Sequence, residues 1–219
     1  MISLALLGVC LFPSCQSSST SSTEKTSRVE TLPFYSEATF TPHWLTPKSD
    51  SLKDFHQIPP FSLINQNGEA ITEQTFADKI YITDFFFTSC PGICPKMTKN
   101  MGVLQEAFLQ DEDVLLLSHS VMPHYDSVAV LKNYAEVKEV VDDKWHLVTG
   151  DRDHIYGLGR NAYFVEEDLG IEKDLDDFLH TENFVLVDKN RHIRGIYNGL
   201  NSGSIEQLIA DVKTLKEEG

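Results

Sequence analysis

The stretch Ile80-Tyr-Ile-Thr-Asp-Phe-Phe-Phe87 runs directly into Thr88-Ser-Cys-Pro-Gly-Ile-Cys-Pro95. The first half is a near-continuous series of β-branched and aromatic residues, which is typical of a strand buried on both faces. Beyond the two Cys-Pro steps, apolar residues recur at helical spacing between Lys96 and Leu109. The sequence therefore predicts a buried strand, a turn that carries two cysteines, and a helix, in that order.

Strands and helices alternate along the rest of the chain. Turn residues Asn67-Gly68 predict a hairpin, and Asp126 is the expected N-cap of a later helix. The expected segments are a hairpin over 61–71, strands over 114–118 and 145–149, helices over 126–137 and 153–163, an acidic solvated loop over 166–177, a strand pair over 184–188 and 192–197, and a closing helix over 204–216. This order predicts an α/β domain. The cysteine turn makes it thioredoxin-like, a three-layer domain with a mainly parallel central sheet and a C-terminal hairpin plus helix.

The first residues predict an export signal. Ile2–Phe12 is an apolar run shorter than the about 20 residues that a membrane span needs, and it fits the apolar core of a signal peptide. Cys15 and a Ser/Thr-rich tether follow, an order that resembles a bacterial lipoprotein signal with Cys15 as the lipidated residue. An ordinary secretory signal, or an internal start with no lipid, is the alternative, and Cys10 is a poorer lipid acceptor because more apolar residues follow it. We expect a signal segment over 1–15, a flexible tether and irregular lead-in over 16–57, and the folded domain over 58–219.

Composition and charge narrow the possible functions. The chain has 219 residues, of which 41% are hydrophobic, and a formal net charge of −15. A surface this acidic repels phosphate backbones, so a nucleic-acid partner is not expected. Four cysteines are too few for a disulfide-stapled miniprotein. The expected product is an exported, membrane-anchored lipoprotein that faces the periplasm or the cell exterior.

The chemistry points to Cys90 and Cys94. Cysteines four apart at the start of a helix place both sulfurs on one face, and the free backbone N–H groups there favour thiolates. Thiolates serve both redox chemistry and the binding of soft metal ions. Three intervening residues leave the sulfurs freer to clamp one metal ion than two would. A static disulfide or a pair of buried thiols is the structural alternative.

A histidine could complete a metal site at this edge of the sheet. In a parallel sheet, ligands gather beyond the carboxyl ends of the strands, where Cys90 lies. His119 and His124 follow the next strand along the chain, and His180 precedes a strand expected to run antiparallel and so to begin at the same edge. Position alone leaves these three histidines open.

These residues resemble the Sco/SenC family of membrane-attached copper proteins, which assist cytochrome c oxidase assembly. The resemblance rests on Phe86-Phe-Thr-Ser-Cys-Pro-Gly-Ile-Cys-Pro-Lys-Met97, on Trp145 with the later Leu147-x-Thr-Gly150, and on His180-Thr followed by Val-Leu-Val-Asp188. It implies a thioredoxin fold that binds one copper ion, as Cu(I) or Cu(II), through Cys90, Cys94 and His180. It also implies a respiratory oxidase subunit, or another copper protein, as the partner.

Three positions depart from the family pattern. Gly92 replaces the usual Asp after the first Cys-Pro, and Leu179 replaces the usual Asp before the histidine. The usual Asp-Pro-Glu-Arg-Asp is Met122-Pro-His-Tyr-Asp126, which places two copper-competent side chains, Met122 and His124, near the expected site. No expected ligand is lost.

Two functions from different classes therefore compete. The first is a copper-binding and delivery protein rather than a turnover enzyme. The second is a thiol-disulfide oxidoreductase that acts on exported proteins and keeps a partner's cysteines reduced. Both use the redox pair Cys90 and Cys94, but only the first needs His180. A peroxide-reducing enzyme is a more distant third, because the residues beside Cys90 show no peroxidase pattern.

Overall fold

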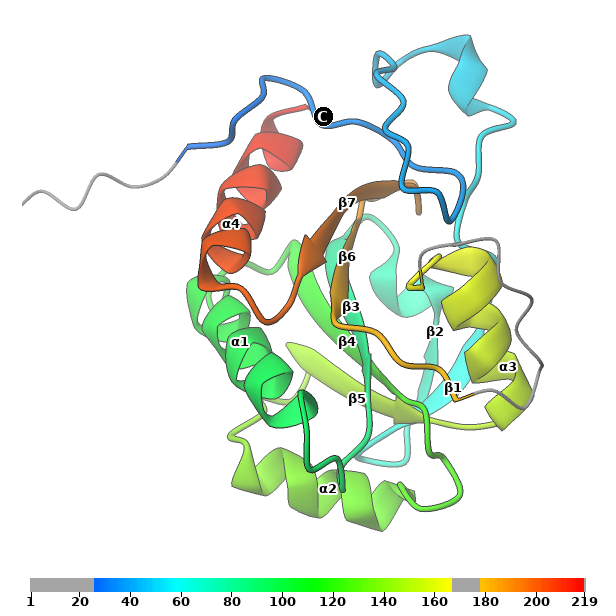
Figure 1. The fold of residues 1–219 in the computed structure, drawn as a ribbon, viewed down its shortest axis with the longest axis vertical. Helices are drawn as coiled ribbons and strands as arrows, with labels where there is room; N and C mark the ends of the chain where they lie inside the picture. Colours follow the sequence, from blue (N-terminus) through cyan, green and yellow to red (C-terminus); the bar gives the residue numbers. More distant parts are fainter. Residues whose placement is uncertain (1–25, 167–177, 219) are drawn as a thin grey trace, which may run out of the picture.

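The computed structural model describes residues 26–166 and 178–218. Its centre is one seven-stranded sheet with the strand order β2-β1-β5-β4-β3-β6-β7 (Figure 1). The expected signal segment with Cys15, most of the tether, and residues 167–177 of the acidic stretch lie outside the described residues.

The three central strands are parallel. β3 (Ile80–Phe86), β4 (Val114–Ser120) and β5 (Trp145–Thr149) are joined by α1 (Cys94–Ala107) and α2 (Val128–Val137). Every residue of these three strands is buried, as their apolar runs predict. The helical crossovers leave the carboxyl ends of all three strands at one edge, the edge where the cysteine turn begins.

The sheet as a whole is not mainly parallel, and this part of the prediction needs correction. β1 (Ser62–Asn65) pairs antiparallel with both β2 (Ala70–Thr72) and β5, and β6 (Asn183–Val187) pairs antiparallel with both β3 and β7 (Ile193–Asn198). Short turns join β1 to β2 and β6 to β7, and such turns can only join antiparallel strands, whereas parallel neighbours need a crossover. Each hairpin then pairs one of its strands antiparallel with the parallel centre. Each edge of the sheet is a hairpin, and only the centre is built from crossovers.

Two apolar clusters, one on each face of the sheet, confirm the three-layer arrangement. The first gathers core residues of α1, α2 and α4 (Ser202–Glu217), and the second gathers those of α3 (Arg152–Gly157) and the π-helical turn Leu158–Ala162 that continues it. Figure 1 shows α1 and α4 together on one side of the sheet and α3 on the other. In the described part of the chain, no helix is long and apolar enough to cross a membrane.

The lead-in before the first hairpin is irregular but packed. It holds the 3-10 turn Asp50–Leu52 and two isolated β-bridges, one of which joins Tyr35 to Ile193 of β7. Leu32 and Phe34 are buried against the domain. A second 3-10 turn, Glu73–Phe76, follows β2. The lead-in therefore packs along the β7 edge of the sheet.

Candidate metal centre

The cysteine turn connects the carboxyl end of β3 to the first residue of α1. Cys94 opens the helix, and its N-cap residue Ile93 makes no side-chain capping bond. Both cysteines are reduced; Cys90 is half-buried and Cys94 is buried. Each thiol influences the pKa of the other. The structure thus brings the two predicted sulfurs together at the start of a helix.

The environment makes Cys90 the more acidic thiol. Partial burial alone would raise its pKa, but backbone hydrogen bonds from Cys94, Gly92 and Ile93, together with the Cys94 thiol, lower the pKa below its ordinary value. These are the unpaired N–H groups of a helix start, which favour a thiolate. Cys90 is therefore the sulfur that can act as nucleophile or first metal ligand.

Cys94 behaves in the opposite way. Burial raises the pKa of its thiol to about 12; a backbone hydrogen bond at Phe87 opposes the shift, whereas Cys90 and Asp84 add to it. Cys94 therefore keeps its proton until Cys90 is engaged by an oxidant or a metal ion. The pair therefore combines an accessible thiolate, which can react first, with a buried thiol, which can react second to form a disulfide or to bind the same metal ion.

A buried carboxyl lies behind the pair. Asp84 of β3 accepts a short hydrogen bond from the Ser118 hydroxyl, which in turn accepts one from Trp145 Nε1 at 2.9 Å. Burial raises the pKa of Asp84 to about 7, although the Ser118 bond lowers it in part. Sequence analysis missed this residue, because one Asp inside an apolar strand run gives no signal beyond its own presence.

The role of Asp126 also differs from the prediction. The N-cap of α2 is Ser127, whose hydroxyl accepts a hydrogen bond from the Val130 N–H. Asp126 is fully buried and accepts hydrogen bonds from the Thr88 N–H at 3.1 Å, the Thr88 hydroxyl at 2.5 Å and the Ser120 hydroxyl at 2.5 Å. It therefore ties the turn after β4 to the cysteine turn, two residues before Cys90.

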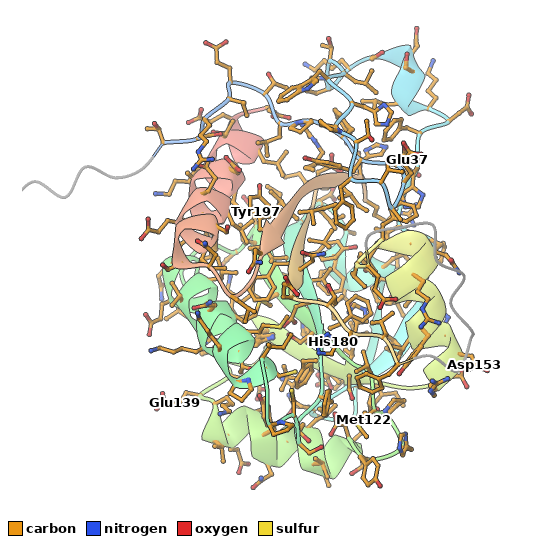
Figure 2. All side chains as sticks on the ribbon, in the orientation of Figure 1. Glu37, Met122, Glu139, Asp153, His180 and Tyr197 are labelled. Atoms are coloured by element: carbon orange, nitrogen blue, oxygen red, sulfur yellow. The ribbon has the colours of Figure 1, made fainter. Side chains whose placement is uncertain are left out.

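His180 lies on the segment that leads into β6, and its side chain is exposed. Its backbone N–H donates to Glu166 Oε1 at 3.3 Å. Two residues earlier, the Phe178 ring meets the Phe87 ring edge-on, with centroids 5.4 Å apart. This contact places the His180 segment beside the start of the cysteine turn, and Figure 2 shows His180 at the same end of the sheet as Met122.

The described residues do not hold a closed three-ligand site. Within 26–166 and 178–218, no group of three or more His, Cys, Asp or Glu side chains is arranged to hold a metal ion. The structure brings Cys90 and Cys94 together but leaves His180 outside such a cluster. Its assignment as a ligand therefore stays a prediction.

The other two candidate histidines, His119 and His124, differ in burial. His119 is fully buried, stacks on the Phe85 ring at 4.5 Å, and shares a hydrogen bond between Nδ1 and the Thr83 hydroxyl. Burial lowers the pKa of His119 to about 3. It is a core residue. His124 is exposed on the turn after β4, where its ring lies 4.6 Å from that of Tyr125, so it remains a rival to His180.

The donor set fits a soft metal ion. Two free thiols on one turn at a helix start, one of them made acidic by backbone N–H groups, match the preference of Cu(I) for sulfur ligands. An exposed imidazole nearby would complete a site able to hold Cu(II) as well. In class, the molecule is a thioredoxin-like α/β domain with a paired-thiol centre at the carboxyl edge of its parallel strands.

The sequence comparisons give the family. The model of the SCO1/SenC family matches residues 49–217, so the chain belongs to the SCO1/SenC family. A SCO1 protein homolog from Bacillus subtilis is 29% identical over 163 residues, which cover 73% of this chain and 82% of that protein. The family resemblance drawn from the cysteine turn is thereby confirmed.

Solved structures agree with the fold. A SCO1/SenC family lipoprotein from Bacillus anthracis has a TM-score of 0.64 at 27% identity and covers 74% of this chain and 95% of its own. BsSco, in which a disulfide switch was identified and which is a member of the Sco family of cytochrome c oxidase assembly proteins, has a TM-score of 0.61 at 27% identity, with 73% and 93% covered. Copper-bound ScoI from Bradyrhizobium japonicum has a TM-score of 0.57 at 28% identity, with 72% and 98% covered.

Proposed function

We propose that this protein binds one copper ion through Cys90, Cys94 and His180 and passes it to a copper site of a respiratory oxidase during assembly. The observation that carries the proposal is the reduced cysteine pair, with one acidic accessible thiol and one buried thiol at the start of α1. The copper-bound relative and the oxidase-assembly description of BsSco support the choice of metal and of partner.

The thiol pair determines when copper can bind. Copper needs both sulfurs reduced, so metal loading and a Cys90–Cys94 disulfide exclude each other. Cys90 would engage the ion first because its thiolate is accessible, and Cys94 would lose its proton as the ion arrives. Transfer to a partner would begin at the same exposed sulfur, since Cys90 is the ligand that an incoming thiolate can reach.

A second function is favoured by a specific observation. The unequal pKa values of Cys90 and Cys94, with the proton-holding Asp84 behind them, suit a thiol-disulfide oxidoreductase that reduces a partner's cysteines. The disulfide switch identified in BsSco supports this alternative. This function needs no histidine, and that difference separates the two candidates.

The discriminating experiment replaces His180 in the full chain. With His180→Ala we expect loss of the Cu(II) thiolate charge-transfer band and a smaller effect on Cu(I) held against a chelator, because two thiolates still bind Cu(I) but hold Cu(II) poorly. Reduction of a model disulfide should continue at the wild-type rate. His124→Ala is the matched control.

Other outcomes reassign the site. A Cu(II) band that survives in His180→Ala and vanishes in His124→Ala would transfer the ligand role to His124. Copper binding unchanged in both variants would favour the oxidoreductase. Copper binding that survives replacement of both cysteines by serine would overturn the copper proposal altogether.

We further propose that lipidated Cys15 anchors the exported protein to the membrane. The motivation is the apolar run before Cys15 and the polar tether after it, and the description of the Bacillus anthracis relative as a lipoprotein supports it. Exported Cys15→Ala protein should leave the membrane fraction, because acyl chains bind membranes through their buried methylene groups. Continued sedimentation with membranes would contradict the anchor.

A further inference from the structure

The turn after β4 lies directly beside the cysteine turn. β3 and β4 are parallel, with Phe86 opposite Ser120, and the pairing continues past the strand ends where the Val121 N–H donates to the Phe86 carbonyl at 2.8 Å. Continued past the strand ends, the same register puts Val121 opposite Phe87 and Met122 opposite Thr88, two residues before Cys90. Neighbouring strands are about 4.8 Å apart, so Met122 enters its turn beside the start of the cysteine turn.

Hydrogen bonds hold this turn in place. The Met122 carbonyl accepts from the N–H groups of Tyr125 and Asp126, both at 2.9 Å, and the Met122 N–H donates to the Ser120 hydroxyl at 3.2 Å. The buried Asp126 carboxylate then bonds Thr88 twice, as described above. The position of Met122 is thereby fixed relative to the cysteine turn, with no contribution from its own side chain.

The Met122 side chain is unlike the other methionines of the described chain. Met97 and Met101 are fully buried in α1. Met122 is only half-buried and packs against the apolar cluster on the α3 face. Cys90 and Cys94 belong to the cluster on the α1 face, and Phe87, at the end of β3, packs against both clusters. A partly exposed thioether is thus available on the residue next to a strand end that leads to two thiols.

We propose that Met122 is a further ligand for Cu(I) at the Cys90–Cys94 centre and that Asp126 is the residue that positions it. A thioether is a soft, uncharged donor, so it adds a ligand to a Cu(I) dithiolate without adding negative charge. It favours Cu(I) over Cu(II), whereas an imidazole such as His180 also suits Cu(II). This inference rests on the proposed copper function. It assigns the stabilisation of Cu(I) to Met122 and that of Cu(II) to His180.

The test uses selenomethionine-labelled full-length protein loaded with Cu(I) under anaerobic conditions. X-ray absorption at the copper and selenium edges should show Cu–S scattering from the thiolates and Cu–Se scattering from one selenium. Met122→Leu, which nearly conserves volume and so should fold, should abolish the Cu–Se signal and keep the Cu–S signal. The buried Met97 and Met101 remain in that variant as internal controls.

Two further measurements sharpen the result. Met122→Leu should weaken Cu(I) retention against a chelator several-fold and leave the Cu(II) charge-transfer band unchanged, which is the reverse of the His180→Ala pattern. Asp126→Asn, which preserves shape but removes the charge that accepts from Thr88, should reduce the Cu–Se signal while Cu–S scattering persists. An undiminished Cu–Se signal in Asp126→Asn would overturn the positioning role.

Failure of this inference differs from failure of the proposed function. Cu–S scattering without any Cu–Se scattering in the labelled wild type would overturn the Met122 ligand and leave copper binding intact. If no copper is retained, or if copper is retained after both cysteines are replaced, the proposed function fails and the Met122 inference fails with it.

Discussion

Two buried polar clusters of this molecule differ in whether their charged groups are paired. In β7, Arg194 donates to Asp188 at 3.3 Å, to Glu218 at 2.5 Å and to the carbonyls of Leu32 and Pro33, while its guanidinium lies over the ring of Phe34. Every charge in this cluster has an opposite charge or a hydrogen-bond partner. The cluster ties the lead-in and the C-terminal helix to the sheet.

The second cluster lies behind the cysteine pair and is built around the carboxyl group of Asp84. Asp84 has the Ser118 hydroxyl as its side-chain partner, and across the residues that the structure describes no lysine or arginine forms an ion pair with it. An unpaired buried carboxylate is costly, so this group keeps a proton to about neutral pH instead. The comparison indicates that one cluster secures the fold and the other holds a proton near a thiol.

The largest expected effect comes from breaking the Arg194 cluster. Arg194→Met should lower the free energy of unfolding by about 3–5 kcal/mol, because it leaves Asp188 and Glu218 as buried charges without their partner. Urea denaturation followed by tryptophan fluorescence measures this loss. The exposed pair Lys53–Asp50 supplies the control.

Lys53→Ala should change the free energy of unfolding by no more than about 0.5 kcal/mol, since exposed pairs contribute little. In the folded fraction of Arg194→Met, the alkylation rate of Cys90 should equal that of the wild type. A slower rate would mean that the two clusters are coupled, and the contrast drawn above would be wrong.

The second largest effect is an increase in the free energy of unfolding when Asp84 is replaced, and the size of this increase depends on pH. The pKa of Asp84 is raised from its ordinary value of 3.8 to about 7 in the folded protein. Between these values the unfolded carboxyl has lost its proton and the folded one has kept it, so this group lowers stability progressively as pH rises through that window. Asp84→Asn should therefore match the wild type at low pH and exceed its stability above neutral pH.

The expected gain is on the order of 4 kcal/mol above neutral pH, because each pKa unit between 3.8 and about 7 corresponds to about 1.4 kcal/mol. Denaturation curves of both proteins over the pH range provide the measurement, with Asp153→Asn, at an exposed carboxylate, as the flat control. The same substitution should lower the pKa of Cys94, because the Asp84 charge raises it. Parallel stability profiles for Asp84→Asn and the wild type would show that the carboxyl is ionised in the folded state.

Local sequence signals predicted most of the fold. The buried run of β3, the Asn-Gly hairpin and the helix after the cysteines all depend on neighbours a few residues apart. The antiparallel pairing of β1 with β5 does not, because two segments far apart in sequence decide it. The family model and the solved relatives confirm the thioredoxin-like fold.

Only those parts of the site that depend on residues close together in the sequence could be predicted. Cys90 and Cys94 follow from spacing at a helix start, but Asp126 acts on Thr88 across 38 residues, and a helix N-cap was the nearest local explanation. His119 looked equivalent to His124 because β4 is buried on both faces, so no alternation shows which face the imidazole enters. Only packing separates the two.

The smallest effect concerns a charge placed beside the site rather than behind it. A Cβ atom built on Gly92 would lie 3.8 Å from the Cys90 sulfur, which is ordinary contact, so a side chain can be added without strain. Gly92→Asp should raise the pKa of Cys90 by about 0.5–1 unit, because a nearby carboxylate disfavours the thiolate. Gly92→Asn, of equal size and no charge, is the matched control.

The pH dependence of Cys90 alkylation measures this shift, since Cys94, with a pKa of about 12, does not react in the same range. Neither substitution should change the free energy of unfolding by more than about 0.5 kcal/mol, because Gly92 is exposed. A charge at the cysteine turn would then act on reactivity and not on stability, whereas a charge removed from the Arg194 cluster acts on stability alone. Equal shifts in Gly92→Asp and Gly92→Asn would instead attribute the pKa of Cys90 to the backbone of the turn, whose N–H groups already lower it.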